Sequence, residues 1–440
     1  MMRILLIGKG AREHALAWKL RQTARHVFVV PGNGGTAAMA TNVSNIDGVD
    51  MHDFKELIQV AHSLSIDLVL TGPDDIVVAG IADAFKQAGI PCFAPSKAAS
   101  QLEGSKVFAK DFMTRHNIPT AKYRSFSRYE DAREYISAAN YRVVIKSSGL
   151  AAGKGVVLPE SKEDSYKELY EVMVGKKFGS ANAHVVIEEF LLGDEISILT
   201  FSDGRTFKSL PPCQDHKQIF DGSKGPNTGG MGVYGPTDFV SSSIMDEIER
   251  KIIGPTFEGL RSDGHVFQGM LFTGVMITRD GPKVLEYNVR FGDPETLSLV
   301  PLLREETDLA KLCLSCTNGT LENETLGIQK GYACNVVVAS AGYPGEHKQG
   351  DKIEIASCPQ RKSIHIFHAG TILESGGLWT AGGRVFAVCA VRETLAEAVA
   401  AAYSGVACIR FQGQQYRTDI GSRYAVPSRT YSYDFSQVNS

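Results

Sequence analysis

The sequence predicts a multidomain protein of mixed α/β and α+β class, with a parallel-sheet α/β domain at the N-terminus. At 440 residues the chain is too long to fold around one ordinary core. Residues 1–95 alternate apolar runs with amphipathic segments, which is the pattern of parallel strands connected by helices. Past residue 330 the pattern indicates a small α+β domain, with strands over 336–339, 352–355, 364–367 and 385–389 and an Ala-rich helix over 395–403.

Composition and charge exclude several classes of protein. Hydrophobic residues make up 43% of the chain and charged residues 22%, as in soluble globular proteins. The formal net charge is −3 with both signs mixed, so we expect no nucleic-acid partner. No window approaches the roughly 18 apolar residues of a membrane span, and the N-terminus lacks a signal-peptide layout. The eight cysteines stand mostly in apolar contexts, so we expect reduced thiols in a cytoplasmic protein, with a monomer as the default.

The N-terminal part contains predicted strands over 4–7, 27–30 and 68–70, and helices over 13–21, 54–64 and 76–87. The loop 8–13, Gly-Lys-Gly-Ala-Arg-Glu, resembles a dinucleotide fingerprint but fails it, because Glu13 holds the third glycine position. The second strand ends at Pro31 without an acid for a ribose, so a nicotinamide dehydrogenase is disfavoured. A tight turn and a phosphate site both stay open. Loops 31–36 and 71–75 follow the next two strands, and the three loops together favour a binding edge.

A composition shift near residue 100 indicates a domain boundary, and a second glycine-rich loop follows at 147–155 between two predicted strands, 141–146 and 156–158. It contains G-x-x-x-G-K-G, which is not a P-loop because the spacing is short by one residue and a strand follows. With Lys146 and Lys154 beside it, its N–H groups would suit a triphosphate. A flexible surface turn is the equal alternative.

Two strand-like runs over 185–198 join at Gly193 and carry Glu188 and Glu195. Acidic side chains at such a junction can form hydrogen bonds with an adenine edge and a ribose, although most acidic side chains at strand junctions do neither. The following loop, 211–232, is rich in glycine and poor in apolar residues, which implies ligand contact, backbone strain or mobility.

A helix over 244–260 and a hairpin turning at 279–282 lead to a predicted strand over 284–290. Period-two alternation places three polar side chains on one face of it, about 6–7 Å apart: Glu286, Asn288 and Arg290. A carboxylate and an amide oxygen at that spacing suit Mg²⁺, and the arginine offers a planar fork for a carboxylate or phosphate. Taken alone, a strand with one solvent-facing side explains the pattern as well.

Eleven stretches, from residue 8 to residue 421, occur in one order that resembles the ATP-grasp ligases, and among them the phosphoribosylamine–glycine ligase (glycinamide ribonucleotide synthetase) family. They are GKGAREHALAWKL, PGNGGT, QLEGSKVFAKDFM, VVIKSSGLAAGKGVV, SLPPCQDHK, GPNTGGMG, NVRFGDPET, GYPG, FHAGT, GGRVFAV and YRTDIG. The combination of QDHK, GPNTGGMG and NVRFGDPE is highly specific, whereas one glycine turn is not.

The resemblance implies an N-terminal α/β domain over 1–103 on the ribose-phosphate side and an ATP-grasp domain over 104–330. Within the latter, a smaller nucleotide lobe would occupy about 121–192, completing a two-lobed clamp, and a C-terminal α+β domain would cover 331–440. It further implies a ligase of purine (IMP) biosynthesis. This enzyme would join glycine to 5-phosphoribosylamine through glycyl phosphate, giving glycinamide ribonucleotide, ADP and phosphate.

The resemblance also implies roles for individual residues. ATP would be bound by Lys106, Lys146, Gly149, Gly153, Lys154, Gly155, Glu188, Leu191 and Glu195. Glycine and phosphoribosylamine would be met by Gly8, Gly10, Asn33, Asp215, Lys217 and Arg290. Mg²⁺ or Mn²⁺ would be bound by Glu286 and Asn288. Catalytic roles would fall to Arg290, Lys146 and Asp215.

The chain departs from the family pattern at Ala11, Asp74, Ile76, Gln218, Phe220, Ser223 and Lys224. These departures keep two alternatives open. One is another ATP-grasp carboxylate–amine ligase, and the other is a non-catalytic nucleotide-binding relative.

Replacing Lys146 by alanine should slow turnover by roughly 10²–10³, because a fixed charge facing the transferring phosphoryl group would be lost. Steady-state rates at saturating ATP measure this effect. Turnover close to that of the wild type would refute the assigned role.

Overall fold

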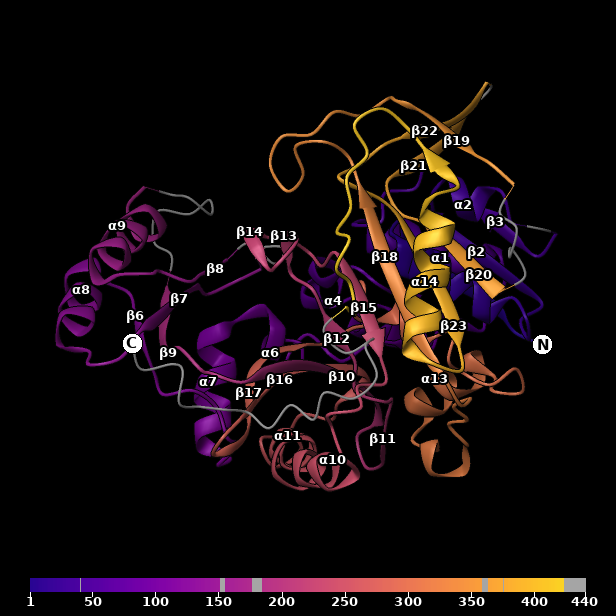
Figure 1. Cartoon of the computed structure of the whole chain (residues 1–440). Helices are drawn as coiled ribbons and strands as arrows, with labels where there is room; N and C mark the ends of the chain where they lie inside the picture. Colours follow the sequence, from indigo (N-terminus) through magenta and orange to yellow (C-terminus); the bar gives the residue numbers. More distant parts are fainter. Residues whose placement is uncertain (40, 151–154, 176–183, 358–362, 375, 423–440) are drawn as a thin grey trace.

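A five-stranded parallel sheet forms the N-terminal part of the chain, as the alternating pattern predicts (Figure 1). The computed structural model describes residues 1–39, 41–150, 155–175, 184–357, 363–374 and 376–422. The strands, in the spatial order β3-β2-β1-β4-β5, are β1 (Arg3–Gly8), β2 (His26–Pro31), β3 (Val43–Asn45), β4 (Leu68–Thr71) and β5 (Cys92–Phe93). The helices between them are α1 (Ala11–Leu20), α2 (Gly34–Ala37), α3 (Phe54–Ser63), α4 (Asp74–Ala79) and α5 (Ile81–Gln87).

The single helix predicted over 76–87 is wrong, because Gly80 divides it into α4 and α5. Its φ of 101° lies in the left-handed region, which ends one helix and lets the chain turn into the next. The continuous apolar pattern on both sides of this glycine hides the break.

A small lobe projects from the rest of the molecule (Figure 1, left) and holds an antiparallel sheet in the order β6-β9-β7-β8. Its apolar face packs under two helices, with Ile145, Leu169 and Ile187 fully buried in its core. Two helices of the preceding segment are α6 (Gln101–Gly104) and α7 (Lys106–Arg115). The lobe contains β6 (Tyr123–Phe126), α8 (Tyr129–Ala138), β7 (Val143–Ser147), β8 (Val156–Val157), α9 (Lys162–Met173) and β9 (Val185–Glu189).

A second antiparallel sheet, in the order β11-β10-β16-β17, carries the polar strand predicted over 284–290, which ends at Asn288 and leaves Arg290 in the loop that follows. Its strands are β10 (Asp194–Asp203), β11 (Phe207–Ser209), β16 (Gln268–Thr278) and β17 (Gly281–Asn288). The helix predicted over 244–260 consists of α10 (Ser242–Ile248), a π-helical turn (Glu249–Ile253) and α11 (Gly254–Ser262).

A β-bulge interrupts the pairing of β16 with β17. Glu286 pairs with Gly274, but Val284 pairs with Val275, so Leu285 is the extra residue. A bulged residue is left out of the ladder and re-aims the strand. The main-chain oxygen of Leu285 is therefore available to a side chain from elsewhere.

A third sheet, β12-β15-β18-β23-β20, joins the middle of the chain to its C-terminal part across residue 330, where the sequence predicts a boundary. Its strands are β12 (Gln214–Asp215), β15 (Gly232–Gly235), β18 (Tyr332–Ala339), β20 (Ile364–His368) and β23 (Arg384–Arg392). Helix α14 (Leu395–Val406) packs on it. The remaining elements are β13 (Gln218–Phe220), β14 (Lys224–Asn227), α12 (Thr296–Leu299), α13 (Leu309–Asn318), a 3₁₀ turn (Leu321–Asn323), β19 (Lys352–Ile355), β21 (Thr371–Glu374), β22 (Gly377–Thr380) and β24 (Ile409–Arg410).

No helix within the described ranges is long and apolar enough to cross a membrane.

One buried side chain of β18 fixes the loop that follows the polar strand. Asn335 is fully buried, and its Nδ2 donates to the Pro294 carbonyl oxygen (3.1 Å) and to Ser298 Oγ (2.9 Å). This loop lies directly after Arg290, so the C-terminal sheet positions one end of the predicted site.

Asn335→Ala should lower the free energy of unfolding by about 1–3 kcal/mol, because the substitution leaves the buried carbonyl oxygen of Pro294 without its donor. The midpoint of urea unfolding measures the loss. Asn323→Ala, on an exposed turn, is the matched control. Equal midpoints for the two variants would contradict this role.

Candidate active site

A cavity of about 820 Å³ lies between the sheet of the small lobe and the sheet that carries β17. The structure brings most predicted site residues to its wall: Lys106, Lys146, Gly149, Gly155, Glu188, Leu191, Glu195, Asp215, Lys217, Glu286, Asn288 and Arg290. Gly153 and Lys154 lie outside the described residues. Gly8, Gly10 and Asn33 are not among the described residues that line this cavity.

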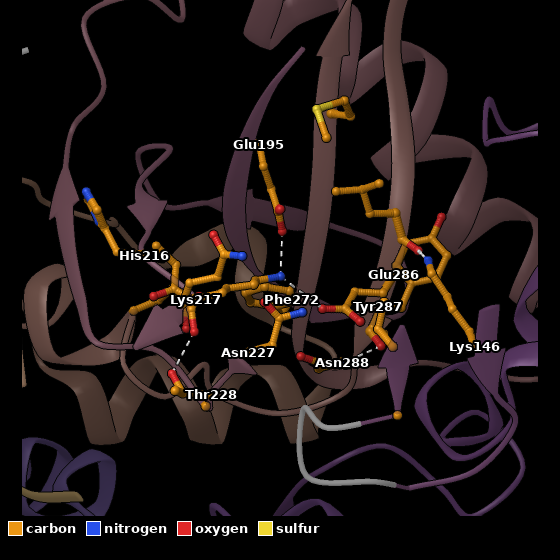
Figure 2. A pocket seen from close by; sticks show the side chains of 18 of the residues that line it. Lys146, Glu195, His216, Lys217, Asn227, Thr228, Phe272, Glu286, Tyr287 and Asn288 are labelled. Carbon is orange, nitrogen blue, oxygen red and sulfur yellow. Dashed lines mark hydrogen bonds and ion pairs between the residues drawn. The ribbon is translucent and has the colours of Figure 1, made fainter. Parts of the chain in front are cut away.

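The two side chains predicted to bind a metal point into this cavity from β17 (Figure 2). Burial alone would raise the pKa of Glu286, but the charges of Lys217, Lys146 and Lys106 outweigh it and lower the pKa to about 2. Asn288 Nδ2 donates to the Tyr287 carbonyl oxygen (2.8 Å). The amide oxygen of Asn288 is thereby left to the cavity, beside a carboxylate that stays ionised.

Lys217 lies between two carboxylates, as Figure 2 shows. Its Nζ is 2.5 Å from Glu195 Oε1 and 3.4 Å from Glu286 Oε1. Burial would lower the pKa of Lys217, but Glu195 and Glu286 raise it well above its ordinary value. Thr228 holds the backbone of Lys217, because its N–H and its hydroxyl both donate to the Lys217 carbonyl oxygen (2.8 and 2.7 Å).

Two further lysines reach the cavity from the other side. Lys106 Nζ donates to the Gly149 carbonyl oxygen (3.1 Å), and burial lowers the pKa of Lys106. Lys146 Nζ donates to the carbonyl oxygen of the bulged Leu285 (3.0 Å) and lies 3.1 Å from Glu188 Oε1. The bulge in β17 thus provides the acceptor that orients Lys146.

Glu188 is buried and its carboxylate contacts lysines on both sides. Oε2 lies 2.9 Å from Lys110 Nζ, and Oε1 lies 3.1 Å from Lys146 Nζ. Its adenine contact, implied by the resemblance, stays a prediction, as do the contacts of Leu191 and Glu195 with the nucleoside.

Three buried polar atoms on the cavity wall have no hydrogen-bond partner: Arg290 Nε, Asp215 Oδ1 and Glu188 Oε1. Glu188 Oε1 lies in the ion pair with Lys146, which leaves Arg290 Nε and Asp215 Oδ1 without a partner of either kind. The rest of the Arg290 guanidinium is held by Glu103 Oε1 (3.0 Å) and by the Phe291 carbonyl oxygen (3.2 Å). Burial and the neighbouring Glu295 raise the pKa of Asp215 well above its ordinary value. Unpaired buried donors and acceptors are rare in native proteins, and at a cavity wall they indicate a ligand.

In the loops that follow β1 and β4, the Glu13 carboxylate occupies the space beside the glycines. The Gly10 N–H donates to Glu13 Oε2 (2.6 Å), and a side chain at Gly8 or Gly72 would collide with the Glu13 carboxylate. This carboxylate takes the place that an anion would have at the start of α1. The Gly10 N–H is therefore already bound within the protein, and the expectation that this turn is not a dinucleotide site stays a prediction.

The side chain of Asn33 likewise makes its hydrogen bonds within the protein. Its Nδ2 donates to the carbonyl oxygens of Lys9 (2.9 Å), Gly10 (3.2 Å) and His368 (2.8 Å), and its Oδ1 caps α2. The ribose-phosphate roles of Gly8, Gly10 and Asn33 stay predictions.

Sequence reasoning missed several cavity residues: Arg12, Glu103, Lys110, Glu295, Arg384 and Arg417. None of the predicted site residues lies beyond residue 330, yet the C-terminal part contributes to the cavity wall. Arg384 of β23 reaches the cavity wall, where it lies 3.2 Å from Asp293 Oδ2 and donates to the Gly229 carbonyl oxygen (2.6 Å). The only sequence signal for it was its place in GGRVFAV.

Two sheets that enclose a nucleotide-sized cavity, with lysines on one wall and an acid–amide strand on the other, define the chain as an ATP-grasp protein. The ATP-grasp (A) domain model of phosphoribosylglycinamide synthetase matches residues 104–296, and the N and C domain models match 2–103 and 333–423. The chain belongs to the phosphoribosylglycinamide synthetase (phosphoribosylamine–glycine ligase) family.

Individual relatives agree with this assignment. The chain is 44% identical to phosphoribosylamine–glycine ligase of Allochromatium vinosum, covering 98% of this chain and 100% of that protein. It is 48% identical to a bifunctional purine biosynthetic protein of Schizosaccharomyces pombe, over 97% of this chain and 54% of that protein. It is 44% identical to the human trifunctional purine biosynthetic protein adenosine-3, over 96% of this chain and 42% of that protein. The chain thus spans about half the length of the multifunctional relatives it matches.

Solved structures share the fold. The crystal structure of phosphoribosylamine–glycine ligase from Thermotoga maritima has a TM-score of 0.82 at 33% identity, covering 95% of this chain and 100% of that one. The biotin carboxylase domain of Hydrogenobacter thermophilus 2-oxoglutarate carboxylase has a TM-score of 0.73 at 15% identity, covering 94% of this chain and 92% of that one. At that identity the second comparison shows the fold alone.

The charge balance around Glu286 predicts how stability depends on pH. Because its pKa is depressed, the stabilisation from the ionised carboxylate is fully present above the ordinary value of 4.5 and is lost as the pH falls through about 2. As the pH falls from 4.5 to about 2, the free energy of unfolding of the wild type should therefore decrease relative to that of Glu286→Gln.

Urea unfolding at successive pH values measures this difference. Glu306→Gln, which replaces a carboxylate side chain that is 73% exposed, is the control. A difference for Glu286→Gln that stays constant between pH 4.5 and 2 would contradict the charge balance.

Proposed function

We propose that this chain is the ATP-dependent ligase that joins glycine to 5-phosphoribosylamine in de novo purine biosynthesis. The observation that carries the proposal is one cavity whose wall holds an acid–amide pair, four lysines and the unpaired buried atoms Arg290 Nε and Asp215 Oδ1. Family membership and the coverage of the whole A. vinosum ligase support the choice of substrates.

A free carboxylate is a poor acceptor for an amine, because it is negatively charged and lacks a good leaving group. In the proposed reaction a glycine carboxylate oxygen attacks the γ-phosphorus of ATP, and ADP leaves. The amine of phosphoribosylamine then attacks the carbonyl carbon of glycyl phosphate, phosphate leaves, and the amine nitrogen loses a proton. Catalysis of such a sequence depends chiefly on positioning and on neutralising the phosphoryl oxygens.

The lysines and Arg290 supply the fixed positive charge. Lys106 and Lys146 would face the phosphates of ATP, and the unpaired Nε of Arg290 would donate to an anionic substrate group. Asp215, with its unpaired Oδ1, would accept a hydrogen bond from an amine. Lys217 keeps Glu286 ionised in the meantime.

Glu286 and Asn288 fit a hard divalent cation, since both can present oxygen atoms to the cavity. The described residues contain no group of three or more His, Cys, Asp or Glu side chains that could bind a metal, so phosphate oxygens and water would complete the shell. ATP-grasp ligases use ATP with Mg²⁺, and we propose that Mn²⁺ serves as well. When bound, the cation supplies charge neutralisation at the phosphates.

We also propose the domain division 1–103, 104–330 and 331–440, a cytoplasmic location and a monomer. The matched N and A domain models meet at residues 103 and 104, which supports the first boundary. The C domain model begins at residue 333, which supports the second, whereas the A domain model ends at 296. The third sheet crosses the second boundary, so the last two domains share one structural layer.

The function is tested by release of phosphate from ATP. We expect release only when glycine, phosphoribosylamine and Mg²⁺ are all present, and none after the cation is chelated with EDTA. Release of phosphate from ATP when both glycine and phosphoribosylamine are absent would favour another ligase. Binding of ATP without release under any condition would favour a non-catalytic relative.

A further inference from the structure

A continuous chain of polar contacts runs through the buried side of the cavity wall. It begins at the Val284 carbonyl oxygen, which accepts from Thr120 Oγ1 (2.7 Å). The same hydroxyl oxygen accepts from Lys110 Nζ (2.7 Å), and Lys110 pairs with Glu188. Through Glu188 the chain reaches Lys146.

The chain ends one residue from where it began, because Lys146 Nζ donates to the Leu285 carbonyl oxygen (3.0 Å). Both ends therefore lie on β17, the strand that carries the acid–amide pair, whereas Glu188 and Lys146 belong to the sheet of the small lobe. The contacts tie the two walls of the clamp together at the bulge of β17.

Lys110 is the charged member of this chain of contacts that has no role so far. It lies on α7 and is 2% exposed, and Glu188, also 2% exposed, is its carboxylate partner. A buried ammonium is costly unless it is paired and hydrogen-bonded, and a surface lysine on the same helix would avoid that cost. The packing of the core alone does not account for a lysine at this position.

We propose that Lys110 is a positioning residue for ATP. Its ammonium group neutralises the Glu188 carboxylate from the side opposite Lys146, so that Lys146 stays directed at the phosphates. The inference rests on the proposed function, since it assumes that Lys146 contacts ATP. Without the Lys110 charge, Glu188 would be balanced by Lys146 alone. The carboxylate would then compete with the phosphates for the Lys146 ammonium.

Protonation of Lys110 should accordingly be visible in ATP binding. Burial lowers the pKa of Lys110 to about 8, against the opposing charge of Glu188. The other groups that face it are Glu189 of β9, Lys146 of β7 and the Tyr123 ring of β6. Because the pKa is lowered, the favourable charge is present below about pH 8 and is lost as the pH rises through that value.

The test compares Mg·ATP binding by the full-length wild type, Lys110→Met and Lys19→Met, by calorimetry between pH 6.5 and 9.5. Lys19 is a matched control, because it is 3% exposed and its Nζ donates to the Arg304 carbonyl oxygen (2.7 Å), outside the cavity. For Lys110→Met we expect a Kd about 10–100-fold higher at pH 7, the range typical of supporting contacts around a site. We also expect the wild type and Lys19→Met to bind less tightly above about pH 8, and Lys110→Met to lack this inflection.

Unchanged affinity at pH 7, or an inflection that persists in Lys110→Met, would overturn the proposal. If Lys110→Met does not fold, Thr120→Val tests the proposal instead. This substitution removes one hydrogen bond of the Lys110 ammonium and keeps the volume of the side chain nearly the same. It should weaken binding about threefold or more, and equal affinity would overturn the proposal. Absence of Mg·ATP binding by the wild type would instead count against the proposed function.

Discussion

The ionised carboxylate of Glu286, held within the field of three lysines, is the interaction on which the rest of this site depends. Lys217 contacts it directly, and Lys106 and Lys146 add their charges from the opposite wall of the cavity. The cluster is arranged for a ligand that brings both signs of charge, since phosphates suit the lysines and a divalent cation suits the acid–amide pair. Each lysine is in turn fixed by a carboxylate or a main-chain oxygen. In the proposed reaction the charges would therefore be in place before a nucleotide binds, which would lower the reorganisation needed for catalysis.

The fold supports this cluster through features that lie far apart in the sequence. A bulge in β17 frees the Leu285 carbonyl oxygen for Lys146, and Asn335 of the C-terminal sheet fixes the loop after Arg290. Arg384, also from the C-terminal part, reaches the same wall. The site is therefore assembled by all three regions of the chain. This is a physical reason for the C-terminal region to share a sheet with the strand that carries Asp215.

Local patterns were sufficient to predict the parallel N-terminal sheet and the polar positions Glu286 and Asn288 of β17, whereas Arg290 lies beyond the end of that strand. Those features depend on neighbours in sequence, where periodicity and residue type carry the information. The break at Gly80, the bulge at Leu285 and the partners of Glu188 could not be predicted in the same way. A single glycine in an apolar helix pattern is often tolerated, and a bulge depends on the register of two strands. Lys110 resembles an ordinary surface lysine of an amphipathic helix, and only the packed structure shows that it is buried.

The central claim is that one acid and one amide on β17 hold the cation that accompanies ATP. The most direct measurement is a crystal structure of this protein with Mn²⁺ and a non-hydrolysable ATP analogue, in which anomalous scattering locates the metal. We expect the strongest peak beside Glu286 Oε and Asn288 Oδ1, with phosphate oxygens completing the shell and Lys146 directed at the same phosphates. A metal bound to other side chains, or a nucleotide outside this cavity, would contradict the account.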